Sequence, residues 1–134
     1  MSRKIRDELL KVTKALPAAD ANADSDSIDL EQASAFPVNE GIEVELAIPA
    51  TPALVEDKTV IFTFQDSADD TTFAAIEELS TVTITGAAAA AGGPAATRVI
   101  KLPSSTKRYI NVNASVLADG GNNTGVSYTL SLLL

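Results

Sequence analysis

The chain is unusual first for what it lacks: its 134 residues include no histidine, no cysteine and no tryptophan. Without imidazole and thiol, the commonest general base, the commonest metal ligand and the strongest free nucleophile are missing. The absence of cysteine also excludes a disulfide framework and leaves the redox compartment open. These absences argue against an enzyme, and we expect no catalytic residue, no cofactor and no metal site.

Positive charge is also scarce. Ten Lys and Arg residues stand against eighteen Asp and Glu residues, so the formal net charge is −8. Phosphate binding needs clustered Lys and Arg, and we therefore expect no nucleic acid partner for the body of the chain. The exception is residues 1–14, where five basic and two acidic residues give a net charge of +3. A basic segment on an acidic body indicates an arm that docks elsewhere.

Long apolar runs are missing as well. No run approaches the length of roughly 20 residues that a membrane-spanning helix needs. The basic N-terminus lacks the continuous apolar stretch of a signal peptide. We therefore expect no membrane partner.

Residues 2–16 fit an amphipathic helix that Ser2 can cap and Pro17 ends. Its apolar residues follow one another at spacings of four, three and four: Ile5, Leu9, Val12 and Leu16. An isolated helix of this length is marginal in water, so its apolar face needs a surface to cover it. We predict a helical arm and linker over residues 1–23.

The rest of the chain consists of short runs in which apolar and polar residues alternate, separated by turn residues. We predict strands over residues 27–30, 41–48, 58–65, 81–85, 97–102, 108–116 and 125–133. Residues 72–79 fit a helical turn or an irregular crossing segment. The alanine-rich residues 86–96 fit a loop, because five alanines between Gly and Pro cannot offset helix nucleation.

Strict alternation is typical of antiparallel sheets that each bury one face. Seven or eight strands at this spacing predict an all-β fold, an antiparallel, jelly-roll-like β-sandwich over residues 24–134 that follows the N-terminal helical arm. The residues expected in its core lie on three strands: Phe62, Phe64, Ile110, Val112, Tyr128 and Leu130.

Two acidic segments and one basic pair are the candidates for ligand binding. Residues 20–31 place oxygen-bearing side chains at positions one, three, five, seven and twelve of a calcium loop. However, Ser25 occupies position six, where the sharp turn of a calcium loop requires glycine. We therefore interpret the segment as an acidic linker. Asp66, Asp69 and Asp70 fit a turn in which Asp binds its own backbone. Lys107 and Arg108 form a compact basic pair outside the arm, and they could meet an acidic partner.

Three segments resemble a known family. They are Asp26-Ser-Ile-Asp-Leu-Glu, then Phe62-Thr-Phe-Gln-Asp-Ser-Ala-Asp-Asp followed by Phe73, and then Arg98-Val-Ile-Lys-Leu-Pro leading into Lys107-Arg-Tyr-Ile-Asn-Val. Over residues 24–134 the chain resembles the capsid cement, or decoration, proteins of tailed bacteriophages, in particular the Bordetella phage cement protein family. In that family strand-forming sequence begins near the N-terminus, so the expected helical arm is a departure from it.

The resemblance implies a jelly-roll protein that binds the outside of an icosahedral capsid and bridges neighbouring major capsid subunits, without enzymatic activity. It implies a virion protein that is assembled in the bacterial cytoplasm and is a dimer or trimer on the shell. We expect contacts with the capsid or with sister subunits at Ile5, Leu9, Val12, Leu16, Lys107 and Arg108.

Other functions stay open at this point. Another virion sandwich, such as a head-completion protein or a tail or fibre module, fits the same pattern of strands. A carbohydrate-binding sandwich is less favoured, because sugar binding commonly uses exposed aromatic residues and the chain has only two Tyr and no Trp. A hydrolase with a carboxylate pair is the least favoured.

Overall fold

The computed structural model describes residues 6–30, 42–103 and 105–133, with side chains from Lys11 onward. The described residues form ten β-strands and contain no α-helix. The strands are β1 (Arg6–Ala15), β2 (Ala21–Asp24), β3 (Ile28–Asp29), β4 (Glu43–Ile48), β5 (Thr59–Ser67), β6 (Ala74–Ala75), β7 (Val82–Thr85), β8 (Ala96–Lys101), β9 (Tyr109–Val116) and β10 (Ser127–Leu133). In this part of the chain, no helix is long and apolar enough to span a membrane.

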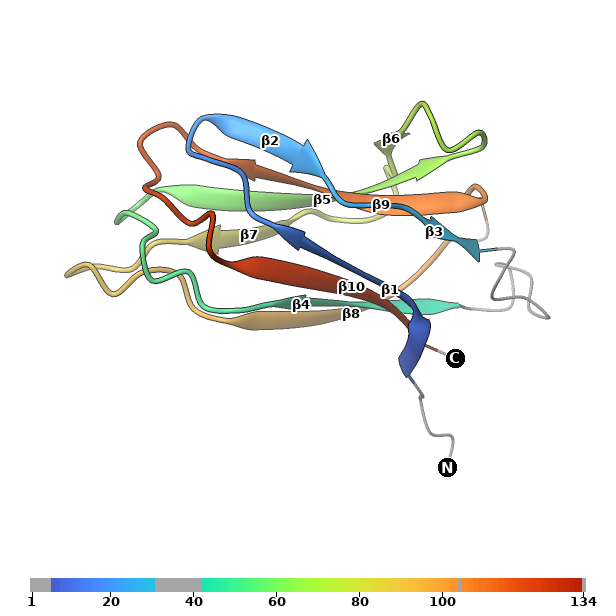
Figure 1. The fold of residues 1–134 in the computed structure, drawn as a ribbon, viewed down its shortest axis with the longest axis horizontal. Helices are drawn as coiled ribbons and strands as arrows, with labels where there is room; N and C mark the ends of the chain where they lie inside the picture. Colours follow the sequence, from blue (N-terminus) through green and yellow to red (C-terminus); the bar gives the residue numbers. More distant parts are fainter. Residues whose placement is uncertain (1–5, 31–41, 104, 134) are drawn as a thin grey trace.

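The strands form two antiparallel sheets, seen as two layers in Figure 1. One sheet has the order β1-β10-β4-β8, and the other has the order β2-β9-β5-β6. Two further short strands complete the second sheet. β3 pairs with β9 beyond the end of β2, and β7 pairs with β5 along the same edge as β6 but nearer the start of β5. The inner faces of the two sheets pack on one another, which is the arrangement of a β-sandwich.

Alternation along the central strands directs one face inward. In β4, Val44, Leu46 and Ile48 are buried while Glu43 and Glu45 are half-buried on the other face. All six residues predicted for the core are buried, so this prediction is confirmed: Phe62, Phe64, Ile110, Val112, Tyr128 and Leu130. Alternating polarity determined these faces correctly, because a shift of one residue would have turned every apolar side chain outward.

Tyr128 links the two sheets. Its ring packs edge-to-face on Phe62 with the ring centroids 5.1 Å apart, and its hydroxyl donates a hydrogen bond of 3.2 Å to the carbonyl of Val112. Burial, with a smaller contribution from the negative charge of Asp24, raises the pKa of Tyr128 to about 12. A buried phenol that finds a backbone acceptor fixes the position of one sheet relative to the other.

The predicted N-terminal helix is wrong for residues 6–15, which form β1 instead. β1 pairs with the edge of β10 from Lys11 opposite Ser131 to Ala15 opposite Ser127. Without β1, β10 would leave its backbone N–H and C=O groups unpaired along that edge, and pairing satisfies them. The prediction failed because the spacing of apolar residues in residues 2–16 reflects only the local sequence. It carries no information about the unpaired edge of β10, which is distant in the chain. Residues 2–5 lie outside the described part.

β2 is a second strand that the sequence pattern did not predict, since residues 20–31 were expected to be an acidic linker. Ala21–Asp24 contains no β-branched residue and has weak strand propensity, yet it pairs with the edge of β9. The division between an arm at residues 1–23 and a sandwich at 24–134 stays a prediction. What the structure shows is that strands from both sides of residue 23 pair within the same sheets.

Candidate interaction surfaces

Four loops meet at one end of the sandwich, on the left in Figure 1. They are residues 16–20, 49–58, 86–95 and 117–126, and they contain six of the seven glycines of the chain. We call this the glycine end. Backbone hydrogen bonds join the loops: Val55 N–H donates to the carbonyl of Gly120 at 3.1 Å, and Thr51 N–H donates to the carbonyl of Gly93 at 2.9 Å.

Close backbone contact at the glycine end depends on the missing side chains. A Cβ atom on Gly86 would lie 2.1 Å from the carbonyl oxygen of Val55. At Gly121, where φ is +87°, a Cβ atom would lie 2.2 Å from the carbonyl oxygen of Ala53. Residues 49–58 are therefore held between two other loops, and the end is closed by backbone packing that leaves no room for a side chain.

The tip of the third loop is a tight turn made of alanine. Ala87 N–H donates to the carbonyl of Gly92 at 2.9 Å, and Ala91 N–H donates to the carbonyl of Ala88 at 3.3 Å. The two central residues, Ala89 and Ala90, have φ values of +60° and +58°. Positive φ at both central positions is the pattern of a type I′ hairpin turn, which favours Asn-Gly. The loop predicted over residues 86–96 is thus confirmed through Ala95, and its conformation is an unfavourable one for alanine.

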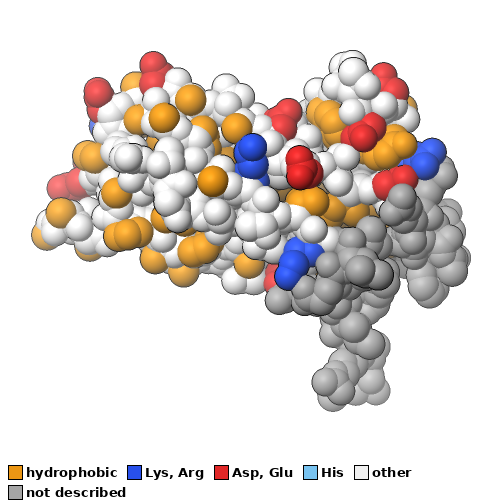
Figure 2. Space-filling model, viewed as in Figure 1, with side chains coloured by type: hydrophobic (Ala, Val, Ile, Leu, Met, Phe, Trp, Pro, Cys, Tyr) orange, Lys and Arg blue, Asp and Glu red, His pale blue; other side chains and the backbone are white. Residues whose placement is uncertain are grey.

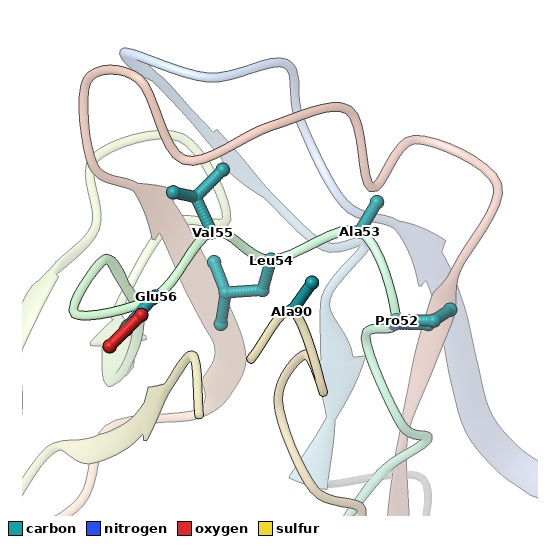
Figure 3. Close-up of a pocket in the computed structure, with 6 residues that line it drawn as sticks. All are labelled: Pro52, Ala53, Leu54, Val55, Glu56 and Ala90. Carbon is teal, nitrogen blue, oxygen red and sulfur yellow. The ribbon is translucent and has the colours of Figure 1, made fainter. Parts of the chain in front are cut away.

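The surface of the glycine end carries exposed apolar residues with acidic residues among them. Figure 2 shows hydrophobic side chains gathered over this end with acidic side chains among them. Val55 is 44% exposed and Leu117 is 47% exposed. Residues 52–56 and Ala90 line an open hollow, in which Figure 3 shows Ala90 beside Leu54.

At the opposite end of the sandwich, carboxylate side chains bind the loops. This end comprises residues 68–81, residues 102–108 except 104, and the strand ends that flank them; we call it the carboxylate end. Here Asp69 Oδ1 accepts hydrogen bonds from Thr71 N–H at 3.0 Å, Thr72 N–H at 3.0 Å and the Ser67 hydroxyl at 2.8 Å. The Thr72 N–H, then the Ser67 hydroxyl and the Thr71 N–H, lower the pKa of Asp69 to about 2. Asp69 therefore binds its own turn, as the sequence predicted, whereas Asp66 was expected in the same turn but lies in β5.

The predicted basic pair belongs to the carboxylate end, in the loop before β9. Lys107 N–H donates to Asp66 Oδ2 at 3.0 Å. Arg108 donates from Nε and Nη2 to the two carboxylate oxygens of Asp29, both at 2.9 Å, and lies 5.0 Å from the centre of the Tyr109 ring. Both side chains are exposed, but the guanidinium of Arg108 already binds a carboxylate of the same chain. A role for the pair in subunit contact stays a prediction.

The other predicted contact residues lie on or near β1. Leu16 is 2% exposed and belongs to the core, and Val12 is half-buried against that core. The side chain of Leu9 and the whole of Ile5 lie outside the described residues. The two described residues of the predicted apolar face, Val12 and Leu16, therefore pack within the sandwich.

The acidic segment at residues 20–31 divides between a turn and two strands. Asn22 Oδ1 and Asp24 Oδ1 accept hydrogen bonds from the Asn113 amide at 3.1 and 2.7 Å. Asp20 lies in the turn before β2 with a φ of +63°, and Glu31 lies outside the described part. Over residues 6–30, 42–103 and 105–133, no group of three or more acidic residues could hold a metal ion.

No sequence pattern marked Ala89, Ala90, Val55 or Leu117 as candidate contact residues. Loop residues show no periodicity, and the alanine run read only as low complexity. One signal was present: a short apolar run between glycines, joining two predicted strands, has the length of a hairpin tip.

Comparison with known proteins gives one family. A protein-family model named Bbp16 matches residues 13–129, which is most of the chain. No curated protein matches the sequence.

Proposed function

Because the chain belongs to the Bbp16 family, we propose that it is a structural virion protein that binds the outer surface of a phage capsid. In this role it bridges neighbouring major capsid subunits and stabilises the shell. The observation that carries the proposal is the family match, whose name suggests a Bordetella phage protein. The resemblance of residues 24–134 to capsid cement proteins supports the specific role.

The strand connectivity supports a jelly roll, which is the fold we propose in detail. If β2 with β3, and β6 with β7, are each counted as one interrupted strand, the ten strands reduce to eight. The sheet orders then become 1-8-3-6 and 2-7-4-5. A jelly roll is such a pair of four-stranded sheets built from two Greek keys, and it is common among capsid proteins.

Bridging needs a stiff body with more than one contact surface. A protein that touches several subunits at once gains avidity beyond any single contact, provided that its surfaces are held at a fixed spacing. The continuous core and the backbone-packed glycine end favour such stiffness. We propose no catalytic role, because the chain has no imidazole or thiol to supply one.

We propose the major capsid protein and further copies of the chain as its partners, with a dimer or trimer on the capsid exterior. Nucleic acid and membrane are not proposed as partners. Light scattering of the purified protein at micromolar concentration tests the oligomer, and isolated monomers on the particle would contradict it.

Copy number on purified particles tests the function. We expect the chain in proportion to the number of capsid subunits, on the outside of the shell, with shells that lack it breaking at lower temperature. A small fixed number at one vertex would instead indicate a head-completion protein, and presence only on tails would indicate a tail or fibre module. Absence from the particle would overturn the proposal.

A further inference from the structure

The alanine turn at the glycine end is unusual in the residue type that it places at positive φ. Elsewhere among the described residues, the positive-φ positions are filled by residues that tolerate this conformation: Asp20, Asp57, Asp70, Asp119, Gly92 and Gly121. Asp and Gly are the ordinary choices, since a short polar side chain or no side chain removes most of the cost. Within the part of the chain that the structure describes, only Ala89 and Ala90 place a methyl group at a positive-φ position.

What alanine provides at the turn, and Asn-Gly does not, is an uncharged apolar surface. The five alanines at residues 87–91 are all exposed. A local departure from favourable turn chemistry that persists without a gain in packing is the kind of feature expected at a functional site. The methyl groups therefore point to a contact that the isolated chain does not contain.

The turn belongs to a larger patch. Ala90 and residues 52–56 line the same hollow (Figure 3). Val55 also reaches the fourth loop, since a Cβ on Gly121 would lie 3.4 Å from Val55 Cγ2. We define the alanine patch as the exposed apolar residues Ala53, Val55, Ala89 and Ala90.

The charges of the four loops select the partner. The loops carry four exposed acidic residues and one half-buried basic residue, Lys58. The acidic residues, which we call the acidic rim, are Asp20, Glu56, Asp57 and Asp119. Two copies joined through this patch would bring like-charged rims together, because an isologous contact places the same surface on both sides. A surface with an apolar centre and a Lys or Arg rim fits instead.

We propose that the alanine patch docks on a protein surface that has an apolar centre surrounded by basic residues. This rests on the proposed function, because the surface is then the outer face of the capsid shell. The acidic rim steers the approach and excludes a second copy, while burial of the methyl groups holds the contact. An exposed patch made mostly of alanine suits several repeated contacts on a shell, each of modest strength.

The first test replaces the turn by its most favourable sequence. The double variant Ala89→Asn/Ala90→Gly should raise the unfolding temperature, because both residues tolerate positive φ. It should also weaken binding to shells that lack the protein by at least about tenfold, measured by cosedimentation. Opposite changes in stability and binding separate a contact role from a structural one.

The second test reverses the charge of two residues of the acidic rim. Glu56→Lys/Asp119→Lys should weaken shell binding at low salt, and the loss should shrink as salt screens the charges. The matched control is Glu77→Lys/Glu78→Lys, which makes the same change in net charge at exposed positions of the carboxylate end. The control should bind like the wild type.

The outcomes distinguish the two proposals. If wild-type protein fails to bind shells, the proposed function fails and the patch loses its partner. If wild-type protein binds and both patch variants bind equally well, the inference is overturned while the proposed function stands. Self-association that the turn variant abolishes would overturn it in favour of a second copy.

Discussion

The two ends of this sandwich are closed by different interactions. At the glycine end, backbone lies on backbone, and the contacts at Gly86 and Gly121 leave no space for a side chain. At the carboxylate end, Asp29, Asp66 and Asp69 hold the loops through hydrogen bonds and one ion pair. Packing by shape is insensitive to salt and pH, whereas carboxylate bonds depend on both. One end therefore presents exposed apolar side chains, whereas carboxylate hydrogen bonds hold the loops of the other end.

The largest loss of stability is expected from a change in the core, on which the loops of both ends depend. Phe64→Ala should lower the free energy of unfolding by about 3–5 kcal/mol, because a buried aromatic ring leaves a cavity. Ile61→Ala on the same strand, where the side chain is 37% exposed, should cost much less. Urea titration measures both, and a loss below about 1 kcal/mol for Phe64→Ala would mean that the inner face of β5 is misassigned.

At the glycine end, a steric clash alone should be enough to destabilise the fold. Gly121→Ala should lower the free energy of unfolding by about 1–3 kcal/mol, because φ is +87° and the new Cβ would meet the Ala53 carbonyl. Gly125→Ala is the matched control, since nothing lies within 4 Å of a Cβ there. Thermal unfolding at low and high salt should give the same loss, and a strong salt dependence would contradict packing as the cause.

The carboxylate end should respond to salt. A double-mutant cycle of Asp29→Asn and Arg108→Gln should give a coupling energy of about 0.2–1 kcal/mol, as is usual for exposed ion pairs. High salt should reduce it. A coupling of zero at low salt would show that the bidentate contact adds nothing to stability.

The smallest expected effect is the pH response of Asp69. Its pKa is lowered from 3.8 to about 2, so ionised Asp69 stabilises the fold above pH 4, and this contribution is lost as pH falls from about 4 towards 2. Asp69→Asn should flatten acid unfolding over that window. Asp70→Asn, which removes a neighbouring charge but none of the hydrogen bonds to Asp69 Oδ1, should keep the wild-type slope.

Local patterns predicted the central strands well. Alternation from Gly41 to Ile48 and from Arg108 to Val116 placed β4 and β9, and it assigned their inner faces correctly. The turn at Asp69 was also predictable, since Asp binds backbone N–H groups two and three residues ahead without help from the rest of the fold. These features depend only on neighbours in the sequence.

The edges of the sheets were not predictable in this way. Residues 6–15 carry a helical spacing, and Ala21–Asp24 carries almost no strand signal, yet both pair with an edge of a central strand. The candidate surface was missed for a similar reason. Ala90 and Val55 lie 35 residues apart, and they line the same hollow only because the two loops pack together.

The sequence by itself therefore determined the all-β class, the buried faces of the central strands and the absence of imidazole and thiol chemistry. Only the tertiary structure decided that the N-terminal segment is a strand, that four loops join at one end, and that two alanines adopt positive φ beside exposed apolar side chains. The physical reason is that burial follows a local periodicity of two residues, whereas an edge strand or a loop cluster is stabilised by backbone groups distant in the chain.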